Sequence, residues 1–264
     1  MRIQRRARLG RMPSMALLMT AWAVTGSALA AGADEPEATP YRPSVSTPAA
    51  LSAPGWIEIE AGIARDLQGS VRLDSVPATI KLAFTPDWGV RIGGDAWQRR
   101  RDGSSRSSGV GDVDVVLKRR FAWDESQAFG LEAAATLPTA HGDAGVRKAA
   151  WGVNAIYSAD VGAWHADLNF AGTRLGAPDP GASRLVVLWA AALSRPLDAQ
   201  WGLVGELSGT RQTGAQPSSQ ALVAATYALS RRLVLDVGAA RGLRSGPVTW
   251  SAFGGFTWTA ARLF

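Results

Sequence analysis

The sequence has no cysteine, and only two histidines and three tyrosines occur among its 264 residues. The lack of cysteine excludes disulfides, cysteine-based zinc or iron–sulfur sites, a thiol nucleophile and a lipid-modified N-terminal cysteine. No run of 18 apolar residues occurs, so the chain offers no conventional helical membrane span. Charged residues make up 19% of the chain and hydrophobic residues 47%, a balance that excludes a wholly disordered protein.

The first 30 residues have the layout of a secretion signal. Residues 1–14 carry five arginines and no acid, residues 15–24 are apolar, and Ala28-Leu29-Ala30 supplies small residues at the −3 and −1 positions. We predict cleavage near Ala30. A retained N-terminal anchor is the alternative, which the short apolar run disfavours. Cleavage removes five of the 28 basic residues and none of the 22 acidic ones, so the net charge falls from +6 to +1. No nucleic-acid partner is therefore expected.

The chain after residue 30 divides into a proline-rich extension and a long region of alternating residues. Residues 31–55 contain five prolines and little periodicity. From Trp56 onward apolar and polar residues alternate, which is the signal of strands. Twelve strands are predicted, at 56–65, 70–84, 88–98, 109–121, 128–138, 149–158, 163–174, 183–194, 201–210, 219–229, 232–242 and 247–258. Their number is even and each is about ten residues long, as in a membrane-spanning β-barrel.

Alternation alone does not distinguish a membrane barrel from a soluble periplasmic β-protein. Three features favour the membrane. The even-numbered connections are short while most odd-numbered ones are long. Nine tryptophans lie near strand ends, where interfacial aromatic girdles are found, although buried core tryptophans are the alternative. The chain ends in Phe264, similar to the assembly signal of outer-membrane barrels, although Arg262 interrupts the alternation. Pro77 predicts a bulge or register change inside the second strand.

Three stretches resemble a known family. Arg42-Pro43-Ser44-Val45-Ser46-Thr47-Pro48, which leads into residues 54–62, resembles the opening of an outer-membrane barrel family assigned to meta-pathway phenol degradation or transport. Residues 109–114, with Lys118 and Phe121, are similar to its central Gly-x-Gly-Asp strand. Leu137-Pro138-Thr139 resembles its next feature, with Ala140 where glycine is usual. The resemblance implies an all-β fold: an antiparallel transmembrane β-barrel of about 12 strands over 56–264.

The polar face of the predicted strands carries thirteen candidates for lumen-facing residues. They are Glu58, Glu60, Lys81, Arg91, Asp95, Asp112, Asp114, Lys118, Glu132, His165, Asp167, Glu206 and Asp236. Arg91 and Asp95 are expected beside Asp112, Asp114 and Lys118, with Glu132 completing a belt of mixed sign. The charges either select a solute in a polar passage or pair with one another to fill a narrow lumen, and both interpretations stand.

A second candidate site is basic. Residues 99–108 are predicted as an extracellular loop, in which Arg99, Arg100, Arg101 and Arg106 are candidate contacts for lipopolysaccharide phosphates. A loop that only contacts solvent is the alternative.

No catalytic motif is evident. His165 and Asp167 point the same way on one strand, as a base and its orienting acid would, but a lumenal polar pair is the favoured interpretation. His141 is expected in an exposed loop. Neither a nucleophile elbow nor a metal motif occurs, and no helix is predicted after Gly109-Val110-Gly111 to make it a dinucleotide fingerprint. We expect no enzymatic activity, cofactor or metal.

The leading hypothesis is a passive channel or transporter for small solutes, hydrophobic or aromatic ones included, in the outer membrane of a Gram-negative bacterium. A closed structural barrel and a lipid-acting outer-membrane enzyme are the alternatives. Expected partners are outer-membrane lipid, lipopolysaccharide, a small-molecule solute and the barrel-assembly machinery. Whether residues 31–55 hang free or enter the barrel is left open by the sequence.

Overall fold

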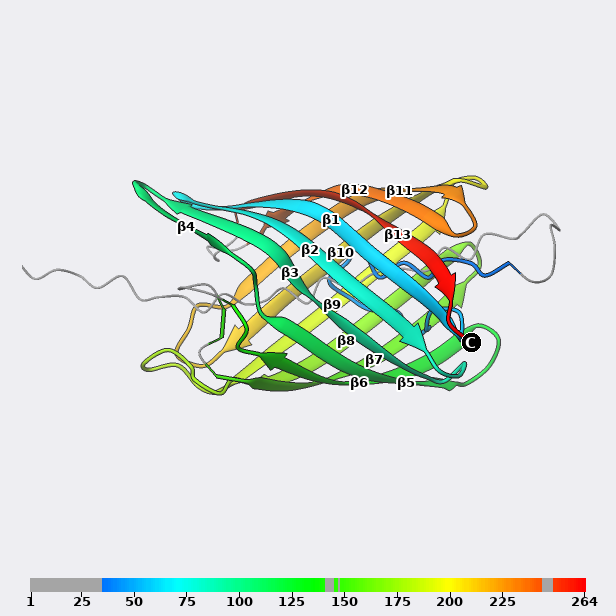
Figure 1. Cartoon of the computed structure of the whole chain (residues 1–264), viewed down its shortest axis with the longest axis horizontal. Coiled ribbons are helices and arrows are strands. Elements are labelled where there is room, and N and C mark those ends of the chain that lie inside the picture. Colours follow the sequence, from blue (N-terminus) through cyan, green and yellow to red (C-terminus); the bar gives the residue numbers. More distant parts are fainter. Residues whose placement is uncertain (1–34, 141–144, 147, 244–248) are drawn as a thin grey trace, which may run out of the picture.

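The computed structural model describes residues 35–140, 145–146, 148–243 and 249–264. The predicted signal segment 1–30 and His141 lie outside these residues. Within them the chain forms thirteen strands in one antiparallel sheet (Figure 1). The strands are β1 Trp56–Gln68, β2 Val71–Ala83, β3 Trp88–Asp102, β4 Ser105–Gly109, β5 Val113–Ala122, β6 Gln127–Leu137, β7 Ala150–Val161, β8 Trp164–Arg174, β9 Leu185–Pro196, β10 Trp201–Gln212, β11 Ser218–Ser230, β12 Leu233–Gly242 and β13 Trp250–Arg262.

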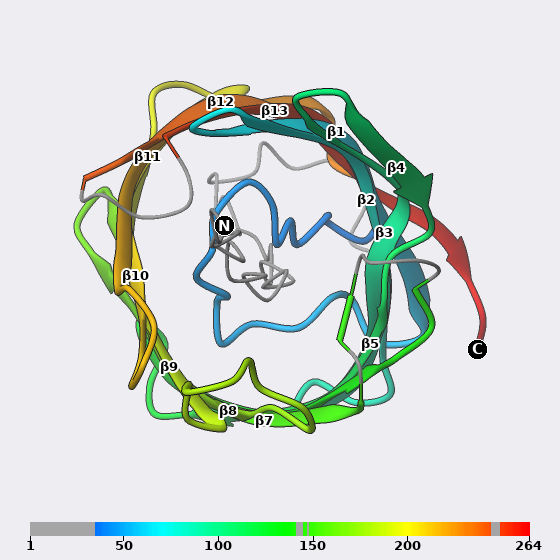
Figure 2. The same ribbon diagram turned by 90° about the vertical axis from the view of Figure 1, so that its left-hand side faces the viewer.

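The sheet closes on itself because β1 pairs with both β2 and β13. Strand β3 pairs with β2 on one side, and on its other side with β5 near its start and β4 near its end. The wall is therefore a closed twelve-stranded barrel with one extra strand at its rim, seen along its axis in Figure 2. Closure satisfies the backbone hydrogen bonds of every wall strand without leaving a sheet edge. The predicted fold class is confirmed.

The predicted loop at 99–108 is wrong. Strand β3 runs on to Asp102, and β4 folds back on it in regular register from Asp102↔Ser105 to Gln98↔Gly109. Gly103 and Ser104 make the turn, and Gly103 has a φ of 57°. Glycine at the first central position of a two-residue turn matches the twist of the strands it joins, so the arginine-rich segment forms a hairpin. The predicted strand at 109–121 is correspondingly split into β4 and β5 by residues 110–112.

The predicted irregularity at Pro77 is confirmed. The register between β2 and β3 shifts between Val76 and Pro77, because Pro77 lies opposite Asp95 while Val76 lies opposite Trp97. Ala96 is thus an extra residue on β3, a β-bulge beside a proline that has no N–H for the ladder. The bulge moves Trp97 from the face predicted for it, with Arg91 and Asp95, to the apolar face of Val90 and Ile92.

The short connections are tight turns. They comprise residues 84–87, 123–126, 162–163, 197–200 and 231–232, as the sequence predicts, and all five leave the barrel at the end near the C-terminus (Figure 1). In the fourth turn Asp198 accepts hydrogen bonds from the backbone N–H groups of Trp201 and Gln200, both 2.8 Å long. These bonds stabilise the carboxylate and hold the pKa of Asp198 below its usual range.

The outside of the barrel is apolar all round. Side chains that remain well exposed on successive wall strands include Ile63, Ile80, Ile92, Leu131, Val153, Phe170, Leu193, Val223 and Val237. Tryptophans at strand ends, such as Trp88, Trp151, Trp164, Trp201 and Trp250, are also exposed. A water-soluble protein rarely shows a continuous apolar surface of this extent, whereas a barrel surrounded by hydrocarbon requires one.

None of the described residues forms a helix that is long and apolar enough to cross a membrane.

The inside of the barrel holds a part of the chain itself. Residues 38–52, called the lumenal segment below, cross the interior before the chain enters β1 (Figure 2). Residues 40–49 are buried without interruption. The segment is tied to the wall at its end by the N–H of Gly55, which donates to the carbonyl of Ala83 at 2.9 Å. The proline-rich extension therefore fills the lumen instead of hanging free.

Candidate functional site

The candidate site is the lumen, in which side chains of the wall meet the lumenal segment. Ten of the thirteen predicted lumen-facing residues are buried, while Asp95, Asp114 and His165 are half-buried. Buried charges are costly unless they are paired and hydrogen-bonded. The partners of these buried charged residues therefore indicate whether the lumen is an open polar passage or is filled by ion pairs.

Six charges form the centre of the site. Lys81 on β2 places its Nζ 2.7 Å from a carboxylate oxygen of Glu58 and 2.7 Å from one of Glu60, both on β1. Across the lumen Glu132 on β6 lies 3.5 Å from Lys118 Nζ and 3.7 Å from Arg91 Nη2. Three acids and three bases balance, so this part of the lumen is neutral although every member is charged.

Tyr41 of the lumenal segment lies between the two halves of this cluster. Lys81 Nζ is 3.8 Å and Lys118 Nζ 4.3 Å from the centre of its ring, within range of cation–π attraction. Its hydroxyl donates to the carbonyl of Ala50 at 2.9 Å and accepts from Lys118 Nζ at 3.1 Å. Its backbone N–H donates to Glu60. The ring thus separates cations that would otherwise face one another directly.

Further acids of the wall are neutralised by the segment. Arg42 reaches Asp236 on β12 with two hydrogen bonds, 3.0 Å from Nε and 3.1 Å from Nη2. Glu206 on β10 accepts from the backbone N–H groups of Val45 and Ser46, both at 2.8 Å, and from the Ser46 hydroxyl at 3.0 Å. Several charge-assisted hydrogen bonds of this kind offset the cost of burying a carboxylate.

The middle of the segment is held by neutral groups. Thr47 N–H donates to Asn169 Oδ1 at 3.0 Å, and Asn169 Nδ2 donates to the Thr47 carbonyl at 2.8 Å. This reciprocal pair imitates the pairing of one more strand residue, although the segment itself is not part of the sheet. The N–H of Ala49 donates to Ser158 Oγ at 2.7 Å, and Ser158 in turn donates to Asp167.

His165 lies at the edge of this network. Its Nδ1 is 2.6 Å from Asp160 and its Nε2 is 3.2 Å from Asp167. The nearby hydroxyl of Ser158 donates to the Asp167 carboxylate, so the proton donor is oriented toward the acid and not toward the imidazole. The arrangement braces β7 against β8, and it lacks the serine–histidine–acid order of a hydrolase.

Asp95, Asp112 and Asp114 lie outside the central cluster of six charges. Asp114 lies opposite Gly93, between Arg91 and Asp95 on β3, so the acids continue from that cluster along the neighbouring strands. Asp112 accepts hydrogen bonds from the N–H groups of Ala140, at 3.0 Å, and Val146, and so holds the connection after β6. Asp114 accepts from the Thr136 hydroxyl at 2.5 Å. Within the described part of the chain, no group of three acids or histidines is arranged to hold a metal ion.

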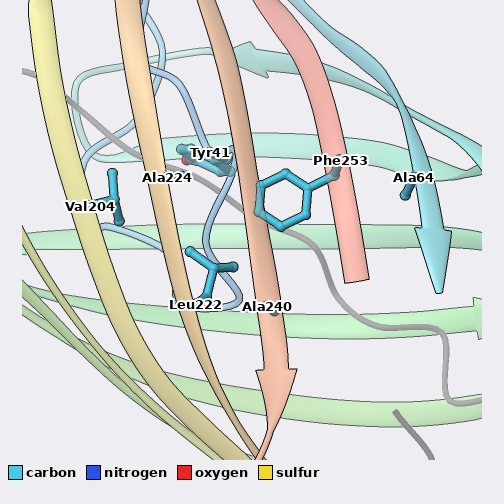
Figure 3. Packing of buried hydrophobic residues seen from close by; sticks show 7 residues of the cluster. All are labelled: Tyr41, Ala64, Val204, Leu222, Ala224, Ala240 and Phe253. Atoms are coloured by element: carbon cyan, nitrogen blue, oxygen red, sulfur yellow. The ribbon is translucent and has the colours of Figure 1, made fainter. Parts of the chain in front are cut away.

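One part of the inner wall, called the apolar side below, is formed by hydrophobic side chains. Val204, Leu222 and Phe253 project inward from β10, β11 and β13 and form a buried cluster with Tyr41 (Figure 3). The Phe253 ring lies over Gly238, where an added Cβ would come within 2.7 Å of the ring. The lumen thus has a charged cluster on β1–β6 and an apolar side on β10–β13, where the acids Glu206 and Asp236 are also buried.

The residues of the lumenal segment were missed as site residues by the sequence interpretation. A signal was nevertheless present. The thirteen lumen-facing candidates comprise nine acids, three bases and one histidine, which leaves an excess of buried negative charge. Such an excess requires donors from elsewhere in the chain, and Arg42 with the N–H groups of residues 39–49 supplies them.

Neither a protein-family model nor a curated protein sequence matches the chain. Solved structures do. An outer membrane channel from Pseudomonas putida F1 is 13% identical, with a TM-score of 0.64 over 78% of this chain and 96% of that one. The NanC porin is 7% identical, with a TM-score of 0.55 over 78% and 100% of the two chains. The KdgM porin is 9% identical, with a TM-score of 0.53 over 76% and 99%.

The chain has the fold of an outer-membrane barrel. At such low identity the likeness concerns the fold alone. The three similar structures are a channel and two porins, and none is described as an enzyme.

Proposed function

We propose that this protein is an outer-membrane channel through which small solutes pass passively, and that the lumenal segment narrows their path. The observation that carries the proposal is the closed barrel with an apolar outside and a charged lumen. The export signal read from residues 1–30 supports a location beyond the inner membrane. The long connections are then extracellular and the short turns periplasmic. The barrel-assembly machinery and outer-membrane lipid are the partners that such a location requires.

The solute we propose is small, and hydrophobic or aromatic solutes are included. The apolar side of the lumen, with Phe253 and Tyr41, supports this class, because such a surface contacts an apolar solute without desolvating a charge. Bonds from several strands of the wall hold the lumenal segment in place, and the segment limits the size of the solute that passes.

Planar-bilayer recordings test the channel. We expect small conductance steps for the parent protein and larger steps for a variant that lacks residues 38–52, because an emptied twelve-stranded barrel leaves a wider opening. A matched control, Glu35→Gln with Glu37→Gln, changes charge just before the lumenal segment and should conduct like the parent. The proposal fails if the parent and the deletion variant conduct no ions and admit no solute into liposomes.

A closed structural barrel is the second candidate, and the dense bonding of the segment to the wall favours it. The channel and the closed barrel differ in whether the lumenal segment ever moves out of its place in the lumen. Ser44 is fully buried and its Oγ has no hydrogen-bond partner among the described residues, so Ser44→Cys changes little. Since the parent has no cysteine, a water-soluble maleimide reports this site alone. Labelling of the folded barrel indicates a segment that moves, while complete protection together with absent conductance indicates a closed barrel. Glu35→Cys, at an exposed position, is the positive control.

A further inference from the structure

The rim of the barrel carries a row of arginines on its outer face. Arg72 on β2 lies directly opposite Arg101 on β3, and Arg101 lies directly opposite Arg106 on β4. Arg99 is two residues from Arg101 and shares its face of the strand. We call Arg72, Arg99, Arg101 and Arg106 the arginine cluster. Arg99, Arg101 and Arg106 belong to the β3–β4 hairpin, which projects from the rim in Figure 1, and Arg72 lies beside them on β2.

A row of adjacent arginines destabilises the sheet by like-charge repulsion unless a counter-charge is present. Directly opposed residues of antiparallel strands have Cβ atoms only about 5 Å apart, and like charges there destabilise the sheet. The charges that act on Arg101 are mainly those of Arg99, Arg72 and Arg106, with Asp74 as the opposing acid. Asp74 is already engaged, at 2.6 Å from Arg65 and 3.0 Å from Arg72.

Among the other arginines, Arg99 lies directly opposite Asp74, whereas Arg101 and Arg106 lie opposite arginines only. In the described part of the chain no salt bridge involves Arg99, Arg101 or Arg106. Arg100 is different, because it lies on the opposite face and is 3.9 Å from Asp102. The basic site predicted from the sequence thus loses Arg100 and gains Arg72. The outer face of the rim carries a positive charge that the described residues leave uncompensated.

The position of the cluster indicates where its counter-charge comes from. Along the same outer face, the residues just before the cluster are apolar: Trp97 is 41% exposed and Ile63 is 68% exposed. The outer face therefore changes from apolar to cationic within one step on β3, from Trp97 to Arg99, and on β1, from Ile63 to Arg65. In a membrane this change falls where acyl chains end and phosphate headgroups begin.

The bulge beside Pro77 is what turns the arginines outward. Without the extra residue Ala96, the alternation of β3 would place Arg99 and Arg101 on the face of Arg91, toward the lumen. The shifted register places them on the face of Trp97 instead. A single backbone irregularity thus moves Arg99 and Arg101 from the pore entrance to the lipid side, and Arg106, which pairs with Arg101, lies on that side with them.

We propose that the arginine cluster binds a phosphate group of a phosphorylated glycolipid of the outer leaflet, of the lipopolysaccharide type. Guanidinium groups bind phosphate oxygens with paired, charge-assisted hydrogen bonds, and arginines on three adjacent strands surround one phosphate from three sides. The acyl chains of the same lipid then lie along Trp97 and its apolar neighbours. The inference rests on the proposed outer-membrane location, but it is independent of whether solute passes the lumen.

Binding of purified lipid A to the detergent-solubilised protein, followed by native mass spectrometry, tests the proposal. We expect the parent to bind diphosphoryl lipid A, and the variant Arg101→Gln/Arg106→Gln to bind it at least about tenfold more weakly. Arg174→Gln/Arg211→Gln is the matched control. Those two exposed arginines end β8 and β10 at the same rim, and neither faces another arginine. The control should bind within about twofold of the parent.

Three outcomes overturn the proposal. The first is equal binding of dephosphorylated lipid A, since the phosphate is the group recognised. The second is equally tight binding of inorganic phosphate or of phosphatidylglycerol vesicles, which would assign the site to free anions or to any acidic lipid. The third is a lower urea midpoint for Arg101→Gln/Arg106→Gln without glycolipid, because loss of like-charge repulsion predicts an equal or higher midpoint. Conductance of these variants should match the parent, so failure here is distinct from failure of the channel proposal.

Discussion

Lys81 is the residue whose removal should disturb the lumen most. Its ammonium group lies 2.7 Å from each of two buried carboxylates and donates to the Thr39 carbonyl at 2.6 Å. Lys81→Met keeps the length of the side chain and removes the charge. Breaking one buried ion pair costs about 3–5 kcal/mol, because the remaining charge is left without its partner. Two acids lose their cation here, so we expect a loss of at least the lower figure, about 3 kcal/mol.

The loss of stability should first release the lumenal segment and leave the barrel wall folded. The strands are held by backbone ladders on both sides, whereas the segment depends on side chains such as Lys81 and Glu60 for its bonds. A cost of about 3 kcal/mol shifts the equilibrium for release of the segment by a factor of about 150. In a Ser44→Cys background, maleimide labelling should therefore become about a hundredfold faster.

Charge balance supplies the control. Lys81→Met with Glu60→Gln removes one acid together with the base, and it should recover a large part of the protection that Lys81→Met loses. If Lys81→Met labels as slowly as the parent and its urea midpoint is unchanged, the central cluster does not hold the segment. If the double variant labels faster than Lys81→Met, the loss is due to packing and not to unpaired charge.

Two further substitutions test other parts of the lumen. Arg42→Gln removes the paired contact with Asp236 and should speed maleimide labelling at least tenfold, an effect that Arg42→Gln/Asp236→Asn should partly reverse. Gly238→Ala should lower the free energy of unfolding by about 1–3 kcal/mol, measured from urea unfolding in detergent, because its Cβ would meet the Phe253 ring at 2.7 Å. Gly205→Ala, with nothing within 4 Å of the new Cβ, should be neutral, and equal losses at the two glycines would refute the packing argument.

The wall of the barrel could be predicted from the sequence because its pattern is local. Each strand is paired with its sequence neighbour, so the period-two alternation and the short turns contain nearly all the information needed. The bulge beside Pro77 could be predicted because a proline has no N–H to donate to the hydrogen-bond ladder of a sheet. The hairpin at Gly103 was missed because a basic, serine-rich segment was read as a loop, although Asp102-Gly103 is a turn signal.

The lumenal segment could not be placed in the same way. Residues 38–52 form neither helix nor strand, and so no periodicity marks their environment. Their partners, among them Glu206 and Asp236, are up to 194 residues away along the chain and come together only when the barrel closes. The charge imbalance of the wall predicts that donors are needed, but it does not say which part of the chain supplies them.

The lumenal segment also has a consequence for the order of assembly. It precedes every strand in the chain, yet its bonds reach β2, β5, β8, β10 and β12 on all sides of the wall. The wall residues that bind the segment surround it only after β1 has paired with β13 and closed the barrel. The occupied lumen and the closed wall therefore arise together, so that a barrel assembled in this way is not an open leak while it is being made.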